Sequence, residues 1–256
     1  MDTTIKVRDV IIGQGIPKIC VSLIGRTLPE LLKEASALIE LEVDIIEWRI
    51  DYFENVEDNF TVQNALKTIR KSVGNIPLLF TFRSAKEGGE KEITQENYFS
   101  LNQCAVESGC IDLVDLELFQ EEENIKSLVD LAKKNQVHVV ISNHDFDKTP
   151  SKKEIVGRLK HAQKLGADIP KIAVMPQSEK DVITLLDATI EMKETAEVPF
   201  ITMSMGGKGS LSRLSGEVFG SSVTFGAAKQ ASAPGQISVM ELKNILNVLH
   251  SSLTPK

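Results

Sequence analysis

Two apolar segments near the middle of the chain, HVVISNHDF at residues 138–146 and IPKIAVMP at residues 169–176, have the pattern of successive β-strands. Both are rich in β-branched residues and are bounded by turn-forming residues, which is typical of buried strands. Between them, Ser151 and Glu154 have the spacing of a helix capping box. The sequence therefore predicts a strand–helix–strand unit at residues 138–176.

Similar units extend in both directions along the chain. The other strand-like runs are KICVSLIG (18–25), DIIEWRID (44–51), PLLFTFRS (77–84), DLVDLEL (112–118), PFITMSMG (199–206) and SSVTFGAA (221–228). Helical stripes separate them, formed in one case by Leu28, Leu31, Leu32, Ala35, Leu38 and Ile39, and in another by Ile125, Leu128, Val129 and Ala132. Eight such units predict one domain, residues 1–256, folded as a (β/α)8 TIM barrel.

The first turn and the N-terminal segment refine this prediction. A doubly wound open sheet is the alternative fold, but it usually has a glycine-rich first turn, and LIGRTLPE at residues 23–30 lacks one. The segment IKVRDVIIGQGIP at residues 5–17 precedes the first predicted strand. We expect it to form a short β-hairpin that closes the floor of the barrel.

Composition narrows the possible partners and the compartment. The formal net charge of -7 argues against nucleic acid or an anionic membrane as the main partner, because both require a basic surface. The three cysteines show no metal-ligand spacing, and MDTTIKVRDV has no apolar signal-peptide core. We therefore expect a cytoplasmic protein without a membrane span, whose ligand is a small molecule.

Polar residues occupy strand positions that should face the barrel interior. Because strand side chains alternate, Glu47 and Arg49 point away from the face that Ile46, Trp48 and Ile50 share. The same alternation groups Thr81 with Arg83, Ser142 with His144, and Lys171 with Ala173 and Met175. Buried charges are costly unless they are paired. The set is either a structural ion-pair network or a catalytic site at the strand ends.

Lys171 is the most informative of these residues. It lies among Ile169, Ile172 and Val174, and a desolvated lysine more readily supplies the neutral amine that a Schiff base requires. His144, on the preceding strand, can reach the same ligand because neighbouring strands lie about 4.8 Å apart. The alternatives are a lysine that extends to solvent and a structural histidine.

Other site chemistries have weaker support in the sequence. His144 could bind metal only together with Glu47, Glu87 or Glu117, and no H-x-H or H-E-x-x-H spacing is present. The segment GGKGSLSR at residues 206–213 lacks the spacing of a phosphate-binding P-loop. We expect neither a metal nor another cofactor.

Six segments of the chain resemble type I 3-dehydroquinate dehydratases. They are EWRID (47–51), TFRS (81–84) with Glu87 shortly after, SNHDF (142–146), PKIAVMP (170–176), SRLSGEVFGS (212–221) and ASAPGQIS (231–238). The segments follow the family's order and cover nearly the whole chain. The resemblance implies a cytoplasmic homodimeric (β/α)8 barrel of the shikimate pathway. It further implies a hydro-lyase, a carbon–oxygen lyase that converts 3-dehydroquinate to 3-dehydroshikimate and water.

The resemblance also implies a role for each matching residue. Lys171 would form the Schiff base, His144 would act as general base and then acid, and Glu87 would orient His144. Arg213 would bind the substrate carboxylate. The remaining substrate-binding residues would be Glu47, Arg49 and Arg83 on the floor, Ser232 and Gln236 on a closing loop, and Ser22 as a weaker candidate. Asp115 and Glu117 receive no role.

Two other functions stay open on the sequence alone. A class I aldolase-type barrel would also use a Schiff-base lysine, but it often requires a phosphate site. A catalytically inactive barrel could act as a binding protein, although it would have no need for Lys171 and His144. Borohydride trapping would separate the inactive barrel from both enzymes, and substrate choice would separate the two enzymes.

Overall fold

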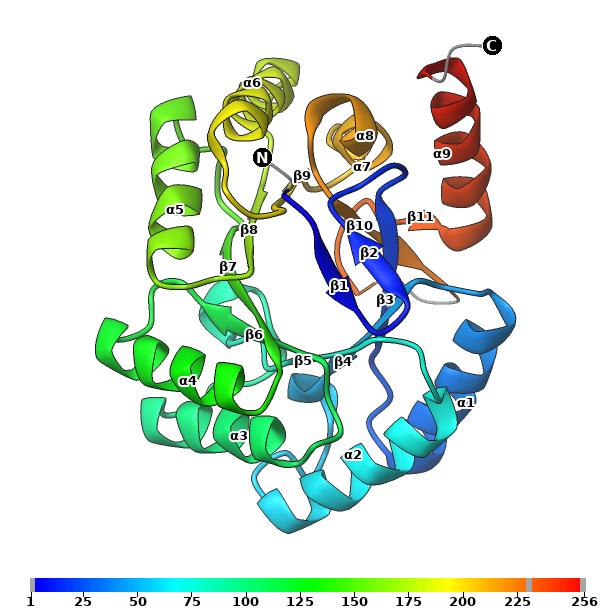
Figure 1. Cartoon of the computed structure of the whole chain (residues 1–256), viewed down its shortest axis with the longest axis vertical. Coiled ribbons are helices and arrows are strands. Elements are labelled where there is room, and N and C mark those ends of the chain that lie inside the picture. Colours follow the sequence, from blue (N-terminus) through cyan, green and yellow to red (C-terminus); the bar gives the residue numbers. More distant parts are fainter. Residues whose placement is uncertain (1–2, 229–231, 254–256) are drawn as a thin grey trace.

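The computed structural model describes residues 3–228 and 232–253, and its centre is a parallel β-sheet that curls into a barrel (Figure 1). Each predicted run forms a strand: β3 (Lys18–Leu23), β4 (Ile45–Arg49), β5 (Leu78–Thr81), β6 (Leu113–Glu117), β7 (His138–Asp145), β8 (Ile169–Val174), β9 (Ile201–Ser204) and β10 (Val223–Ala227). The predicted TIM-barrel fold is therefore confirmed. The domain bounds of 1–256 stay a prediction, since residues 1–2, 229–231 and 254–256 lie outside the described chain.

The strands follow one another around the barrel in chain order, except that β10 pairs with β3. The seam between β9 and β10 has no ladder in the described residues, only an isolated bridge between Phe200 and Ser221. A short strand that the sequence analysis did not predict, β11 (Ile237–Ser238), pairs with the edge of β10 that β3 leaves free. The barrel therefore has one weakly paired seam.

Helices surround the sheet on its outer side (Figure 1). They are α1 (Leu28–Glu40), α2 (Asn59–Val73), α3 (Gln95–Glu107), α4 (Glu122–Lys134), α5 (Lys152–Lys164), α6 (Glu179–Thr195), α7 (Ser210–Leu214), α8 (Gly216–Phe219) and α9 (Val239–Leu253). The predicted stripe of α4 is fully buried, whereas Ile39 of the predicted α1 stripe is 38% exposed, because it lies at the edge of the helix face. None of the described helices is long and apolar enough to cross a bilayer.

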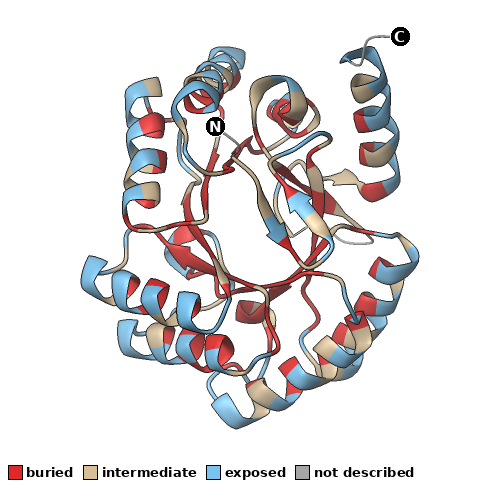
Figure 2. Cartoon of the chain, in the orientation of Figure 1, coloured by how far each residue is buried: buried red, intermediate tan, exposed pale blue. Residues whose placement is uncertain are grey.

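Apolar side chains pack in an inner layer within the barrel and in an outer layer between the strands and the helices, and Figure 2 shows the strands as buried. Ile46, Trp48 and Phe80 pack outward against the helices, as the alternation predicts. The inner layer fills the amino half of the barrel. The hairpin of β1 (Ile5–Val7) and β2 (Val10–Ile12) contributes Val7 and Ile12 to it, and Figure 1 shows this hairpin across the barrel centre. The predicted floor is thus confirmed, and the open cavity lies at the other end.

Candidate active site

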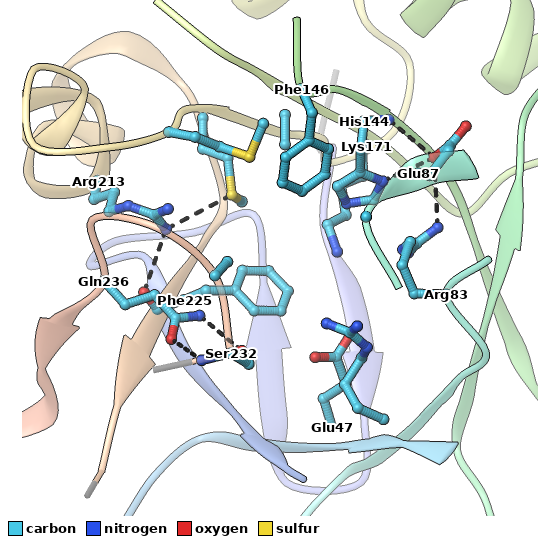
Figure 3. A pocket seen from close by; sticks show the side chains of 16 residues that line it. Glu47, Arg83, Glu87, His144, Phe146, Lys171, Arg213, Phe225, Ser232 and Gln236 are labelled. Carbon is cyan, nitrogen blue, oxygen red and sulfur yellow. Dashed lines mark hydrogen bonds and ion pairs between the residues drawn. The ribbon is translucent and has the colours of Figure 1, made fainter. Parts of the chain in front are cut away.

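A cavity at the carboxyl ends of the strands collects almost all of the predicted site residues (Figure 3). Its lining includes Glu47, Arg49, Arg83, Glu87, His144, Lys171, Arg213, Ser232 and Gln236, together with the apolar residues Phe146, Ala173, Met203, Met205 and Phe225. Ser22 is not part of this lining and contacts it only through hydrogen bonds. The strand ends of a barrel are where catalytic groups gather.

Lys171 points from β8 into this cavity and is only 5% exposed. The register pairs it with Ser142, so His144 lies two pairs further along the same two strands, beside Ala173, and faces the same side. Its Nζ lies 4.3 Å from the centre of the Phe225 ring and 3.7 Å from Asp115 Oδ2. Among the described residues no hydrogen bond to Nζ is formed. The amine is therefore buried and held by charge, and it remains available to a ligand.

His144 contacts Glu87 through both its ring and its backbone. Glu87 Oε2 lies 2.9 Å from His144 Nδ1 and accepts a hydrogen bond from the His144 backbone N–H at 3.0 Å. Asn143 donates to the other carboxyl oxygen, and its own oxygen accepts from Arg158, which fixes the amide orientation. When Nδ1–H donates to Glu87, Nε2 is the ring nitrogen that can exchange a proton with a ligand.

Burial disfavours charge on both members of this pair. It raises the pKa of Glu87 to about 8 against the opposing effect of Arg83. It also lowers the pKa of His144 well below 6.5, and the positive charges of Arg83 and Lys171 add to this effect. A histidine that stays neutral at physiological pH is suited to accept a proton from a substrate.

Two of the predicted arginines are already paired with buried carboxylates. Arg49 makes a two-pronged contact with Asp51, with both hydrogen bonds at 2.8 Å. Arg83 donates to Asp115 at 2.7 Å and to Glu117 at 3.1 Å. Sequence reasoning left Asp115 and Glu117 without a role. Their shared parity in DLVDLEL could have placed them inside the barrel.

Glu47 anchors a chain of hydrogen bonds that leads to the loop after β10. It accepts from Thr81 at 2.9 Å and from Ser22 at 2.5 Å, and Ser22 lies 3.0 Å from Ser232. Gln236 bonds Ser232 through both ends of its side-chain amide. These hydroxyl and amide groups suit a ligand with several hydroxyls. Ala231, the first residue of the predicted loop motif, lies outside the described residues.

Arg213 differs from the other arginines because it has no acidic partner in the described chain. Its guanidinium donates to Pro234 O at 3.0 Å and to Phe225 O at 3.5 Å, while Nε is buried without a partner among the described residues. Burial lowers its pKa to about 10. A buried, unpaired guanidinium at the cavity wall suits a carboxylate, which can accept two of its N–H groups.

Fold and site together define an enzyme of the parallel β/α-barrel class, with an amine and an imidazole facing one cavity. No group of three or more His, Cys, Asp or Glu side chains in the described chain could hold a metal ion. Comparison with known proteins identifies the family.

Residues 19–252 match the family model of type I 3-dehydroquinase, and the chain belongs to that family. It is 56% identical over 254 residues to the 3-dehydroquinate dehydratase of Bacillus licheniformis, covering 99% of this chain and 100% of that protein. It is 57% identical over 244 residues to that of Listeria monocytogenes serotype 4b, covering 95% and 97%. The family excludes the aldolase alternative.

Solved structures agree with this assignment. The type I 3-dehydroquinate dehydratase of Clostridium difficile, determined with covalently modified comenic acid, is 54% identical and superposes with a TM-score of 0.96 over 99% of this chain and 100% of that one. The 3-dehydroquinate dehydratase of Enterococcus faecalis is 46% identical, with a TM-score of 0.90 over 95% and 98%. The described fold is therefore the fold of this family.

Proposed function

We propose that the chain dehydrates 3-dehydroquinate to 3-dehydroshikimate, a hydro-lyase step of the shikimate pathway, through a Schiff base on Lys171. Family membership and relatives at 56% and 57% identity support the substrate and the reaction. The observation that carries the mechanism is the shared cavity of Lys171, His144 and Arg213. It places a nucleophile, a proton acceptor and an unpaired cation around one space.

The reaction begins at the substrate ketone. The Lys171 amine attacks the carbonyl carbon, and loss of the carbonyl oxygen as water leaves an iminium. The iminium draws electrons from the adjacent C–H bond far better than a ketone does, so that proton becomes acidic. His144 Nε2 accepts it, and the electron pair forms an enamine.

Elimination follows from the enamine. Its electrons expel the hydroxyl on the next carbon, and His144 returns its proton to that oxygen, so that water leaves and an unsaturated iminium remains. A second water hydrolyses the iminium and frees Lys171. Arg213 binds the substrate carboxylate, while Glu47, Ser22, Ser232 and Gln236 bind its hydroxyls. In this proposal Arg49 and Arg83 form the bottom of the cavity, and their ion pairs with buried carboxylates keep them in place.

The assay follows from the product, which carries a C=C bond conjugated to its ketone and absorbs in the ultraviolet. Wild type incubated with 3-dehydroquinate should produce this absorbance. If the absorbance does not rise, the proposed function is refuted and the inactive-barrel alternative is left.

Arg213→Ala should raise KM on the order of 10²-fold, because a charge-assisted contact is worth a few kcal/mol. Arg26→Ala, an exposed arginine on a nearby loop, is the control and should leave KM unchanged.

The chain is further proposed to work as a single catalytic domain, as a homodimer in the cytoplasm. The family resemblance supports the dimer, and three buried, unpaired cysteines fit a reducing compartment. Light scattering that gives only the single-chain mass of 28.2 kDa would refute the dimer. Cell fractionation would test the location.

A further inference from the structure

Asp115 on β6 is a buried carboxylate that the mechanism above does not use. Its side chain is 0% exposed. Oδ1 accepts hydrogen bonds from Arg83 and from Ser142, both at 2.7 Å. Oδ2 has no hydrogen-bond partner among the residues that the structure describes, and it lies 3.7 Å from Lys171 Nζ. One oxygen is thus held by the scaffold and the other faces the reactive amine.

Arg83 does not fully compensate the negative charge of Asp115, because its guanidinium also contacts a second carboxylate. Glu117 accepts from Arg83 at 3.1 Å, and the same oxygen accepts from the Ser84 backbone at 2.8 Å. The two carboxylates therefore face two cations, Arg83 and Lys171. Arg83 also lies 3.6 Å from Glu87, so it has carboxylate neighbours besides Asp115, and Asp115 is the carboxylate that contacts both Arg83 and Lys171.

The surroundings of Lys171 Nζ leave little else to balance its charge. The Phe225 ring covers it at 4.3 Å, and a ring face attracts a cation only weakly. In the described chain, Asp115 is the carboxylate within ion-pair distance of Nζ. An unpaired ammonium at 5% exposure would be costly.

We infer that Asp115 is the counter-ion of the Lys171 nitrogen throughout the reaction, first of the ammonium and then of the iminium. The inference rests on the proposed function. The overall step conserves charge: an ammonium and a ketone give an iminium and one water, with two ammonium hydrogens leaving on the former carbonyl oxygen. Because the positive charge stays on the same nitrogen, one fixed carboxylate serves both states.

This role bears on rate, since a protonated iminium draws electrons from the neighbouring carbon far better than a neutral imine does. Burial alone would raise the pKa of Asp115, but Arg83, Lys171 and the Ser142 hydroxyl outweigh it and lower the pKa below its usual value. The carboxylate therefore stays ionised and cannot neutralise the iminium by accepting its proton.

The test compares Asp115→Asn with Glu117→Gln. Both variants remove one charge from the same buried network around Arg83, but only the first removes the contact with Lys171. Each protein is incubated with 3-dehydroquinate and borohydride, and the rate of adduct formation is followed by intact mass together with kcat and KM. Asp115→Asn should lose at least about tenfold in kcat and in trapping rate, which corresponds to about 1.4 kcal/mol less stabilisation of the positive charge on the Lys171 nitrogen. KM should stay close to wild type.

The outcomes separate the two hypotheses. Equal losses in both variants, or wild-type trapping and kcat in Asp115→Asn, would overturn the counter-ion role. No adduct in wild type would instead overturn the proposed function. If Asp115→Asn does not fold, Lys171→Met tests the contact from the other side: carboxyl ¹³C NMR should show Asp115 titrating at higher pH than in wild type. An unchanged titration would contradict the inference.

Discussion

His144 and Glu87, which contact each other in the cavity, show how the charge of single residues depends on burial. Each group would titrate near its ordinary value in water, yet burial raises the pKa of Glu87 to about 8 and lowers that of His144. The short contact between Nδ1 and Oε2 orients the ring. Asn143 donates a hydrogen bond to the Glu87 carboxyl and accepts one from Arg158, which fixes the position of the carboxyl. Neutrality of the histidine is thus a property of the cavity, not of the residue.

The raised pKa of Glu87 predicts a specific pH dependence of stability. A group whose folded pKa exceeds its unfolded value of 4.5 contributes stability that is complete below 4.5 and is lost as the pH rises through about 8. Glu87→Gln cannot lose this contribution. The unfolding free energy of the variant should therefore rise relative to that of wild type between pH 5 and 8, by up to about 1.4 kcal/mol per pH unit at full linkage. Its melting temperature should rise relative to wild type in the same direction.

Thermal melts of both proteins across that range test the prediction. His144 contributes the opposite trend, because its lowered pKa removes stability as the pH falls below 6.5. His144→Gln is the matched variant, and its melting temperature should rise relative to that of wild type as the pH becomes more acidic. A difference between Glu87→Gln and wild type that is flat or shrinks with rising pH would show that Glu87 is not buried as a neutral acid.

Among the structural elements, the β9–β10 seam is joined by one backbone bridge, with a hydrogen bond from Ser222 N–H to Phe200 O at 2.9 Å, and by the side chain of Ser221. Ser221 Oγ accepts from the Thr202 backbone N–H at 3.0 Å and lies 3.2 Å from Thr202 O, in place of a ladder. Ser221→Ala leaves that buried N–H without a partner and should cost about 1–3 kcal/mol of unfolding free energy, with kcat unchanged. Denaturant unfolding measures it, and Ser222→Ala is the adjacent control. Equal stability of the two variants would mean that the seam does not need the hydroxyl.

The elements also show what the sequence could predict and where it stopped. Period-two alternation placed Glu47, Arg83 and Lys171 inside the barrel, because a strand offers its side chains only two faces. It could not place β11 or assign Ser221 to the seam, since both depend on how two distant strands meet. The pairing of Arg83 with Asp115 also joins two separate strands, whereas Arg49 and Asp51 lie two residues apart in one segment, and the alternation of strand side chains does not specify which neighbour an arginine will contact.

Across the whole molecule, the barrel brings together groups that are far apart in the chain. His144 and Lys171 come from β7 and β8, with Asp115 of β6 beside Lys171, and Arg213 lies across the cavity from His144 (Figure 3). The hairpin packs against the amino end of the barrel, and the cavity lined by the predicted site residues lies at the carboxyl end. The resemblance anticipated this convergence mainly because EWRID, TFRS, SNHDF and PKIAVMP lie on strands or at their ends, whereas SRLSGEVFGS brings Arg213 to the cavity from α7.

Intact-protein mass spectrometry after incubation with 3-dehydroquinate and borohydride tests the Schiff base most directly. Wild type should gain one substrate adduct, and peptide mapping should place it on Lys171. Lys171→Ala should form none. His144→Ala should still form adduct, though more slowly, while losing turnover by about 10²–10⁴-fold, the usual worth of positioned acid–base catalysis. An adduct on another lysine such as Lys208, or equal trapping in Lys171→Ala and wild type, would contradict the assignment of Lys171 as the nucleophile.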